Sequence, residues 1–171
     1  TVQALAGTDN VSSMTAYSTR ATVPARAYSS YATNADLTTI IQLDDTIPQS
    51  NEGDQYMSLA ITPTNSGSTL VIDAVLNAAH NVVGGADISV ALFQDTTAGA
   101  LAAVAHGTPT SNLISPIRLR HIMTAGTTSA TTFKVRAGPS TAGTVTFNGQ
   151  ASGRIFGGVM ASSISITEYL P

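Results

Sequence analysis

The sequence contains no cysteine and no tryptophan, and only 10% of its 171 residues are charged. Without cysteine the chain forms no disulfide, holds no zinc finger and carries no thiol nucleophile. Hydrophobic residues make up 43% and aromatic residues 5%, so we expect a core of valine, isoleucine, leucine and alanine. Typical soluble domains are about 25% charged. Because so few charges would solubilise a monomer poorly, we expect part of the surface to be buried against further copies of the chain.

Other absences exclude two classes of partner. The net charge is −3 and the seven basic residues form no cluster, so no nucleic acid is expected as a partner. No apolar run reaches the eighteen residues of a transmembrane helix, so no membrane insertion is expected. The start at Thr1 predicts a processed chain or a fragment, and the residues that follow lack the basic flank and long apolar run of a signal peptide.

Alternating polar and apolar residues predict short β-strands along most of the chain, separated by turn-forming glycine, proline, asparagine and serine. The alanine-rich segment 95–106 is not expected to be a helix, because Thr96, Thr97 and Gly99 are poor helix formers. The pattern predicts one all-β sandwich, with no internal repeat and no second domain. The expected strands are 37–43, 56–62, 69–78, 87–94, 117–123, 131–137, 145–147 and a closing strand in the last stretch.

The last stretch, Phe147–Tyr169, is interpreted as a central strand around which the others are laid. Asn148-Gly149 accepts positive φ at both positions and favours a tight reversal. The pair Gly157-Gly158 is expected to mark a bulge or a close backbone approach. Beyond it, one face is expected to hold Met160, Ile164 and Ile166, and the other Ala161, Ser163, Ser165 and Thr167.

Blocks of sequence spread over residues 40 to 169 carry a resemblance to a known family. They are Asp44–Tyr56, Ala91–Leu101, Met123–Phe133, Phe147–Gly149, Arg154–Gly158 and Ser163–Glu168. In this order they resemble the C-terminal jelly-roll head domain of tailed-phage and prophage fibre proteins, which is related to the tumour-necrosis-factor and complement-type jelly rolls. The resemblance implies an antiparallel jelly roll, a homotrimeric head carried on a fibre, and an irregular connection over 95–106.

Residues 1–36 match nothing in that family and are predicted to form an N-terminal arm or extension, ahead of a jelly-roll domain at 37–171. Met14 to Val23 could make one strand, which Pro24 would end or hold at a sheet edge. One interpretation is an arm that binds other virion proteins. The other is an ordinary outer strand with a loose terminus.

Candidates for the trimer interface or the core come from the alternation. Val71 and Val75 lie opposite the inner residues of strand 69–78, and cover on both faces is what a strand at a subunit interface would show. In the closing strand, Ile164 and Ile166 are expected to be buried near the subunit axis. His121, on the inner face of its strand, is predicted to be a hydrogen-bonded core residue. Alternatively it meets its two copies on a trimer axis and binds a metal or an anion.

Two charged groups stand out. Arg118, Arg120, Lys134 and Arg136 fall on one face of two expected strands, and would form a small basic strip if those strands pair. We expect charges on a solvated sheet face; the alternatives are an ion-pair seam between subunits or a contact for anionic cell-surface glycan. The acids Asp44, Asp45, Glu52 and Asp54 are expected to form a solvated turn, because their spacing matches no calcium loop.

No enzymatic constellation emerges, and no cofactor or metal is predicted. Ser152 is one position late for a nucleophile elbow, and the three histidines lack metalloprotease spacing. A glycosidase would need aromatic platforms that this chain lacks. The leading hypothesis is therefore a non-enzymatic virion protein, the trimeric head of a phage fibre that binds a host-surface glycan or protein. The alternative is a capsid decoration or head-fibre protein on the virion lattice. A secreted ligand similar to tumour necrosis factor is the third.

Overall fold

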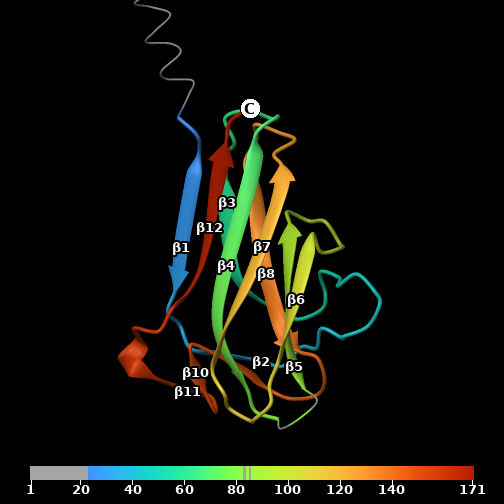
Figure 1. Ribbon diagram of the computed structural model, residues 1–171, viewed down its shortest axis with the longest axis vertical. Coiled ribbons are helices and arrows are strands. Elements are labelled where there is room, and N and C mark those ends of the chain that lie inside the picture. Colours follow the sequence, from blue (N-terminus) through green and yellow to red (C-terminus); the bar gives the residue numbers. More distant parts are fainter. Residues whose placement is uncertain (1–22, 83, 85) are drawn as a thin grey trace, which may run out of the picture.

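Figure 1 shows the computed structural model, which describes residues 23–82, 84 and 86–171. The regular elements of these residues are strands, with one short 3-10 turn, η1 (Phe156–Gly158). None of the described residues belongs to a helix long and apolar enough to span a membrane. The strands are β1 (Arg26–Tyr31), β2 (Ala35–Leu37), β3 (Asp54–Ile61), β4 (Thr69–His80), β5 (Asp87–Gln94), β6 (Ala102–Gly107), β7 (Ser115–Thr124), β8 (Thr131–Pro139), β9 (Val145–Phe147), β10 (Gly149–Gln150), β11 (Gly153–Arg154) and β12 (Ser162–Tyr169).

The long strands form two antiparallel sheets in jelly-roll order. The first sheet runs β1-β12-β4-β7, and the second runs β3-β8-β5-β6. The short strands β2 and β9 prolong the first sheet, because β9 pairs with the end of β4 beyond β12. The first strand thus lies beside the last, and β4 lies beside β7, as in two Greek keys wound together. The all-β, antiparallel jelly roll expected from the sequence is confirmed.

The core lies between the two sheets because both sheets turn their apolar faces inward. On β4, Leu70, Ile72, Ala74 and Leu76 are all fully buried, as the alternation predicts. Their counterparts on β5 are Ile88, Val90 and Leu92, also fully buried. Where β9 prolongs the first sheet, the ring of Tyr56 stacks on that of Phe147, with 4.1 Å between the centroids.

The closing strand is central, but it is shorter than the sequence suggested. β12 pairs with β1 on one side and with β4 on the other, so Ile164 and Ile166 are completely buried. The residues from 148 to 161 leave the sheet and form the hairpin β10–β11 and the turn η1. We call residues 148–161 the excursion. The glycines that suggested a bulge belong to it, and Gly157 and Gly158 both have positive φ.

The expected reversal at Asn148-Gly149 is wrong. The hairpin turns at Ala151 and Ser152, which both have positive φ, between the paired residues Gln150 and Gly153. Asn148 also has positive φ, but its side chain is buried and bonded to the core. Its amide donates to the carbonyls of Tyr31 and Thr33 and to the Tyr56 hydroxyl, and its oxygen accepts from Ser162. The asparagine therefore marks a corner and not a hairpin.

Two further expectations need correction. Residues 102–106, expected in an irregular connection, belong to strand β6, because Ala102 and Val104 turn alternately onto the core while Ala103 and Ala105 face outward. The expected strand at 37–43 ends at Leu37. Beyond it the chain leaves the first sheet, and Ile41 packs on the outside of the second sheet against Ala91 and Phe93.

The last residues of the predicted arm are part of the sandwich. Arg26–Tyr31 forms the outer strand β1, preceded by Pro24. The expected strand from Met14 lies outside the described residues, apart from Val23.

Candidate functional site

The two sheets differ in what covers their outward faces. On the second sheet the segment 38–53 covers part of the outward face: Ile41 is only 2% exposed, and its backbone N–H donates to Pro139 at 3.1 Å. The chain approaches so closely here that a Cβ on Gly138 would lie 2.0 Å from the Thr39 carbonyl oxygen. On the first sheet Ile122 is 56% exposed and Tyr28 68% exposed. The described residues therefore leave this face open to a partner.

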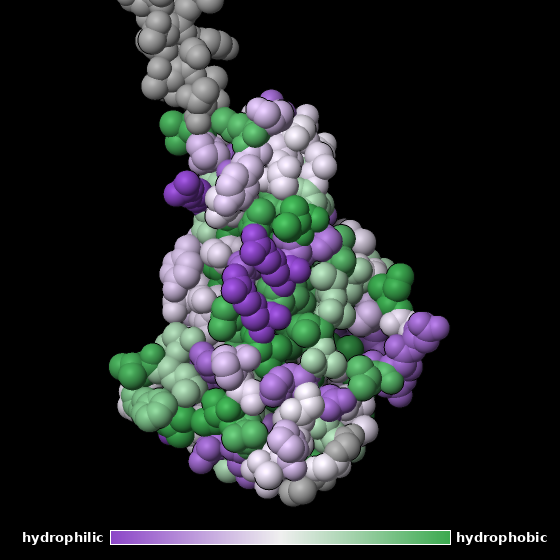
Figure 2. Space-filling view, viewed as in Figure 1, coloured by the Kyte–Doolittle hydropathy of each residue, from purple (hydrophilic) through white to green (hydrophobic). Residues whose placement is uncertain are grey.

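We call the outward side chains of β1, β12, β4 and β7 the open face. Val71 lies on it between Thr167 and Ile122, and Val75 lies between Ser163 and Arg118. Both valines are half-buried by these neighbours. Figure 2 shows hydrophilic side chains in the middle of this side of the molecule, with apolar ones around them. The sequence prediction that this face of β4 is covered at a subunit interface stays a prediction.

The polar centre of the open face is an ion pair within one subunit. Nε of Arg118 donates to Oδ1 of Asp73 at 2.8 Å, and a second bond joins Nη2 to Oδ2. The hydrogen bonds with Asp73, and then its negative charge, raise the pKa of Arg118 above its ordinary value. Arg120 lies directly across from Asp73 in the β4–β7 register. An exposed pair of this kind adds little to stability, but it orients Arg118 along the sheet.

The basic strip expected from four residues does not form, because β7 and β8 lie in different sheets. In this jelly roll the chain crosses from one sheet to the other between β7 and β8, so a shared face in the sequence is not a shared face in space. Arg118 and Arg120 are on the open face. Lys134 donates to the Asp95 carbonyl at 2.7 Å, and Arg136 donates to the carbonyls of Glu52 and Gly53 at 2.8 and 2.7 Å.

The other interface candidates turn inward. Ile164 and Ile166 face the sandwich core across from Ala74 and Ile72. His121 lies opposite Ile72 on the core side of β7 and is half-buried near the C-terminal end of the strand. Of the five residues named for the interface or the core, only Val71 and Val75 therefore belong to the open face.

The acidic loop is bonded to the backbone. One carboxylate oxygen of Asp54 accepts from the N–H groups of Thr38 and Thr39, both at 3.1 Å. Burial opposes the charged form of Asp54, but the bonds from Thr39 and Thr38 and the nearby Arg136 outweigh it and lower its pKa. Asp44 accepts from the N–H and hydroxyl of Thr46, and these bonds lower its pKa. In the described part of the chain no three histidine or acidic side chains converge as a metal site would require.

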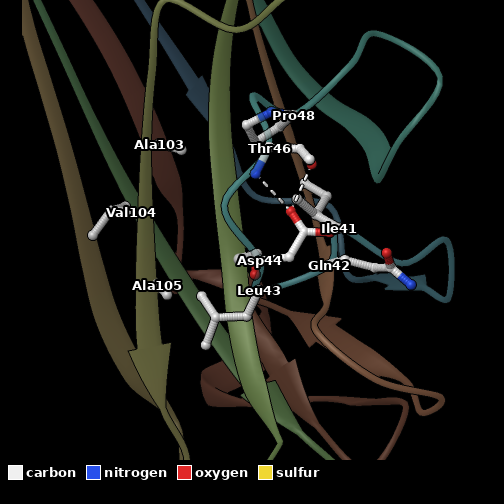
Figure 3. A pocket seen from close by; sticks show the side chains of 10 residues that line it. Ile41, Gln42, Leu43, Asp44, Thr46, Pro48, Ala103, Val104 and Ala105 are labelled. Carbon is white, nitrogen blue, oxygen red and sulfur yellow. Dashed lines mark hydrogen bonds between the residues drawn. The ribbon is translucent and has the colours of Figure 1, made fainter.

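A cleft runs between the loop at 41–48 and strand β6. It consists of two adjoining hollows of about 180 and 410 Å³, with Asp44, Thr46, Pro48 and Ala103 common to both. Figure 3 shows Ala103, Val104 and Ala105 across from Ile41, Leu43 and Pro48. The first hollow is below the 300–1,000 Å³ of a typical small-molecule site. We call the two hollows the β6 cleft.

Two features of the structure escaped the sequence analysis. Glu168 is 1% exposed and accepts hydrogen bonds from three backbone N–H groups, those of Ala25, Thr64 and Asn65. Its position in register with Ile164 and Ile166 was the available signal, because an acid on a buried face must find partners. The excursion carries the other feature, the side chains of Phe156 and Val159, which are 71% and 84% exposed. No sequence pattern separated these from the apolar residues of a strand.

Comparisons with known proteins show distant similarity in fold. No protein-family model and no curated sequence matches the chain. Among solved structures, the Eiger TNF from S. frugiperda is 10% identical, with a TM-score of 0.48 over 85% of this chain and 92% of that one. The VP2 subviral particle of infectious bursal disease virus is 12% identical, with a TM-score of 0.36 over 84% of this chain and 37% of that one. The strand order of the two sheets, and not these similarities, identifies the fold as a jelly roll.

Proposed function

We propose that this chain is a non-enzymatic virion protein that assembles as a homotrimer and forms the head of a phage fibre. The observation that carries the proposal is the unequal cover of the two sheets. Segment 38–53 lies over the second sheet, whereas the first exposes Tyr28, Ile122 and the half-buried Val71 and Val75. Exposed apolar surface of this kind is typical of a protein interface.

The two ends of the sandwich differ, which supports a head with one free end. Val23 to Ala25 and the last residues of β12 lie together, because Glu168 and Ala25 bond to each other. The excursion lies at the opposite end of the sandwich, as Figure 1 shows. A neighbouring fibre protein would join at the first end. The excursion, with its exposed Phe156 and Val159, would then point away from the virion.

Host attachment is the activity that this arrangement would serve. Three excursions presented together would bind a repeated cell-surface glycan or protein with higher avidity than one. The resemblance of residues 40 to 169 to phage fibre heads agrees with this role. No cofactor or catalytic group enters the proposal.

Light scattering of the purified chain tests the assembly. Each chain has a mass of 17.4 kDa, so a trimer has three times that mass, about 52 kDa. A stable monomer at micromolar concentration would refute the trimeric head. Labelled antibodies on intact virions test the location: label at the tips of tail fibres supports the proposal, whereas label spread over the capsid supports a decoration protein.

A cell-binding assay tests the attachment. The double variant Phe156→Ser, Val159→Ser is expected to remain trimeric and to lose binding to host cells. The matched control is Thr127→Ser with Thr128→Ser in the β7–β8 loop, near the terminal end. Equal loss in both variants would mean that the excursion is not the contact.

A further inference from the structure

Strand β6 is a sheet edge that lacks the usual protection against pairing. Edge strands are normally blunted by charged residues, proline or bulges. The other edge strands of the two sheets have such protection. Strand β7 carries Pro116 and two arginines, β3 begins with Asp54 and contains a bulge, and β1 begins with Arg26. The sequence of β6, Ala102–Gly107, contains no proline, no acid, no lysine and no arginine. Among the described residues, β6 pairs with β5 alone.

The hydrogen bonds of β5 show which backbone groups of β6 are free. Asp95 N–H donates to the Thr132 carbonyl, and Ser140 N–H donates to that of Asp87, so the odd-numbered residues of β5 bond to β8. The even-numbered ones must then bond to β6, where their partners are Ala102, Val104 and His106. The N–H and C=O groups of Ala103 and Ala105 therefore point to the open edge.

Next to this free stretch of backbone, residues 98–100 are already paired with another segment of the chain. Just before β6, Gly99 pairs with Gln49, Ser50 N–H donates to Ala98 at 2.7 Å, and Ala100 N–H donates to Pro48 at 2.9 Å. Segment 48–50 thus acts as an outer strand for residues 98–100 and then turns away. A strand added along Ala103 and Ala105 would continue the same line.

The β6 cleft lies beside this edge and would receive side chains. Alternate side chains of an added strand point to the outward face of the sheet, where Ala103 and Ala105 leave room and Ile41, Leu43 and Pro48 form the opposite wall. Asp44 and Asp45 border the second hollow. Backbone pairing combined with a pocket for alternate side chains is how extended peptides add to sheets. The acidic border favours an occupant that carries a basic residue.

The chain itself contains a segment with these properties. Residues 14–22 read Met-Thr-Ala-Tyr-Ser-Thr-Arg-Ala-Thr, rich in β-formers and with Arg20 as their single charge. The 22 residues that precede Val23 can span about 70–80 Å when extended. Figure 1 shows β1 and β6 at opposite sides of the sandwich, which favours the β6 edge of an adjacent copy over that of the same chain.

We propose that residues 14–22 of one copy add as a strand to the β6 edge of a neighbouring copy, with side chains in the β6 cleft. The exchanged strand links the copies of the homotrimer proposed above, and the inference rests on that proposal for the presence of a neighbour.

Disulfide trapping in the full-length chain tests the exchange, since the protein has no cysteine of its own. One set of proteins carries Thr15→Cys, Tyr17→Cys or Thr19→Cys, which together sample the register. A second carries Ala103→Cys. Each arm variant is mixed with the β6 variant under mild oxidation, and products are separated without reductant. We expect a disulfide-linked dimer with at least one arm position, several-fold above that formed with Ser30→Cys on β1 as the control.

A second change tests whether the edge backbone holds the arm. Ala105→Pro removes one free N–H but none of the bonds to β5, so it is expected to abolish cross-linking while the chain stays folded. The proposal is overturned by cross-links no stronger than the control, or by dimers of Ala103→Cys alone. Light scattering of the same samples separates the two ideas: a trimer without cross-links overturns the exchange and leaves the proposed function standing.

Discussion

The carboxylate of Glu168 accepts a hydrogen bond from the backbone N–H of Ala25 at 2.7 Å, which ties the last strand to the residues that lead into the first. The same carboxylate accepts from the N–H groups of Thr64 at 2.9 Å and Asn65 at 3.1 Å. It thereby joins three segments at the terminal end of the sandwich. Burial alone would raise the pKa of Glu168, but the hydrogen bonds from the N–H groups of Ala25 and Asn65 and from the hydroxyl of Thr64 outweigh it and hold the pKa at about 2.

This carboxylate predicts a loss of stability in acid. Its pKa falls from 4.5 to about 2 on folding, so its contribution is complete above pH 4.5 and disappears as the pH falls toward 2. The shift corresponds to about 3 kcal/mol. Urea unfolding at pH 7 and pH 3 should show that Glu168→Gln destabilises the protein at pH 7 and removes part of its pH dependence. Asp45→Asn, at an exposed carboxylate, is the control, and identical pH profiles for wild type and Glu168→Gln would contradict the assignment.

A charge in the closing strand should be tolerated on one face only. Ile166 is fully buried opposite Ile72, whereas Thr167 points to the open face. Truncation of a buried isoleucine to alanine costs about 2–5 kcal/mol, and Ile166→Asp adds an unpaired buried charge. We expect Ile166→Asp to prevent folding and Thr167→Asp to fold with nearly native ellipticity. A soluble and heat-stable Ile166→Asp protein would show that the register of β12 is wrong.

The open face predicts a variant that folds but does not assemble. Val71→Glu places a charge between Thr167 and Ile122 on this face, away from the core. If copies associate here, the glutamate would be desolvated, so light scattering should give a monomer with an unchanged circular dichroism spectrum. Thr128→Glu, in the exposed β7–β8 loop, should leave the assembly intact. A trimeric Val71→Glu protein would place the interface elsewhere.

The acidic loop predicts indifference to calcium. The carboxylates of Asp44 and Asp54 already accept backbone N–H groups, which are the partners a cation would have to replace. The melting temperature should therefore be the same with excess calcium and with excess chelator. In contrast, Asp54→Ala should lower it, because the N–H groups of Thr38 and Thr39 lose their acceptor. A sharp fall on adding chelator would reveal a metal site.

Strands with regular alternation were predictable from the sequence. Thr69–Ala78 and Asp87–Gln94 lie within β4 and β5, because each buries one aliphatic face against the other. β6 was missed since alanine is a strong helix former and gives little strand signal. The pairing of strands was less accessible. Arg118 and Arg136 seemed to share a face, and only the crossover between sheets separates them.

The candidate site was predictable where it follows the period of a strand. Val71 and Val75 were identified from alternation alone, and the structure places both on the open face. The β6 cleft was not, because it arises where a loop distant in sequence folds onto a sheet edge. Asn148 shows the same limit: its turn-like sequence suggested a local reversal, but bonds to Tyr31 and Tyr56 decide its role.

The pairing of β1 with β12 sets a condition on how the protein folds. Arg26 lies opposite Thr167, and Tyr31 lies opposite Ser162, so the first sheet is incomplete until β12 is available. During synthesis β12 emerges after the other strands of the sandwich, and β1 must wait for it with its inner side chains exposed to water. Folds dominated by such distant pairings fold in milliseconds to seconds, far more slowly than helical bundles. Deleting β12 would therefore remove the step that commits the chain to the native state.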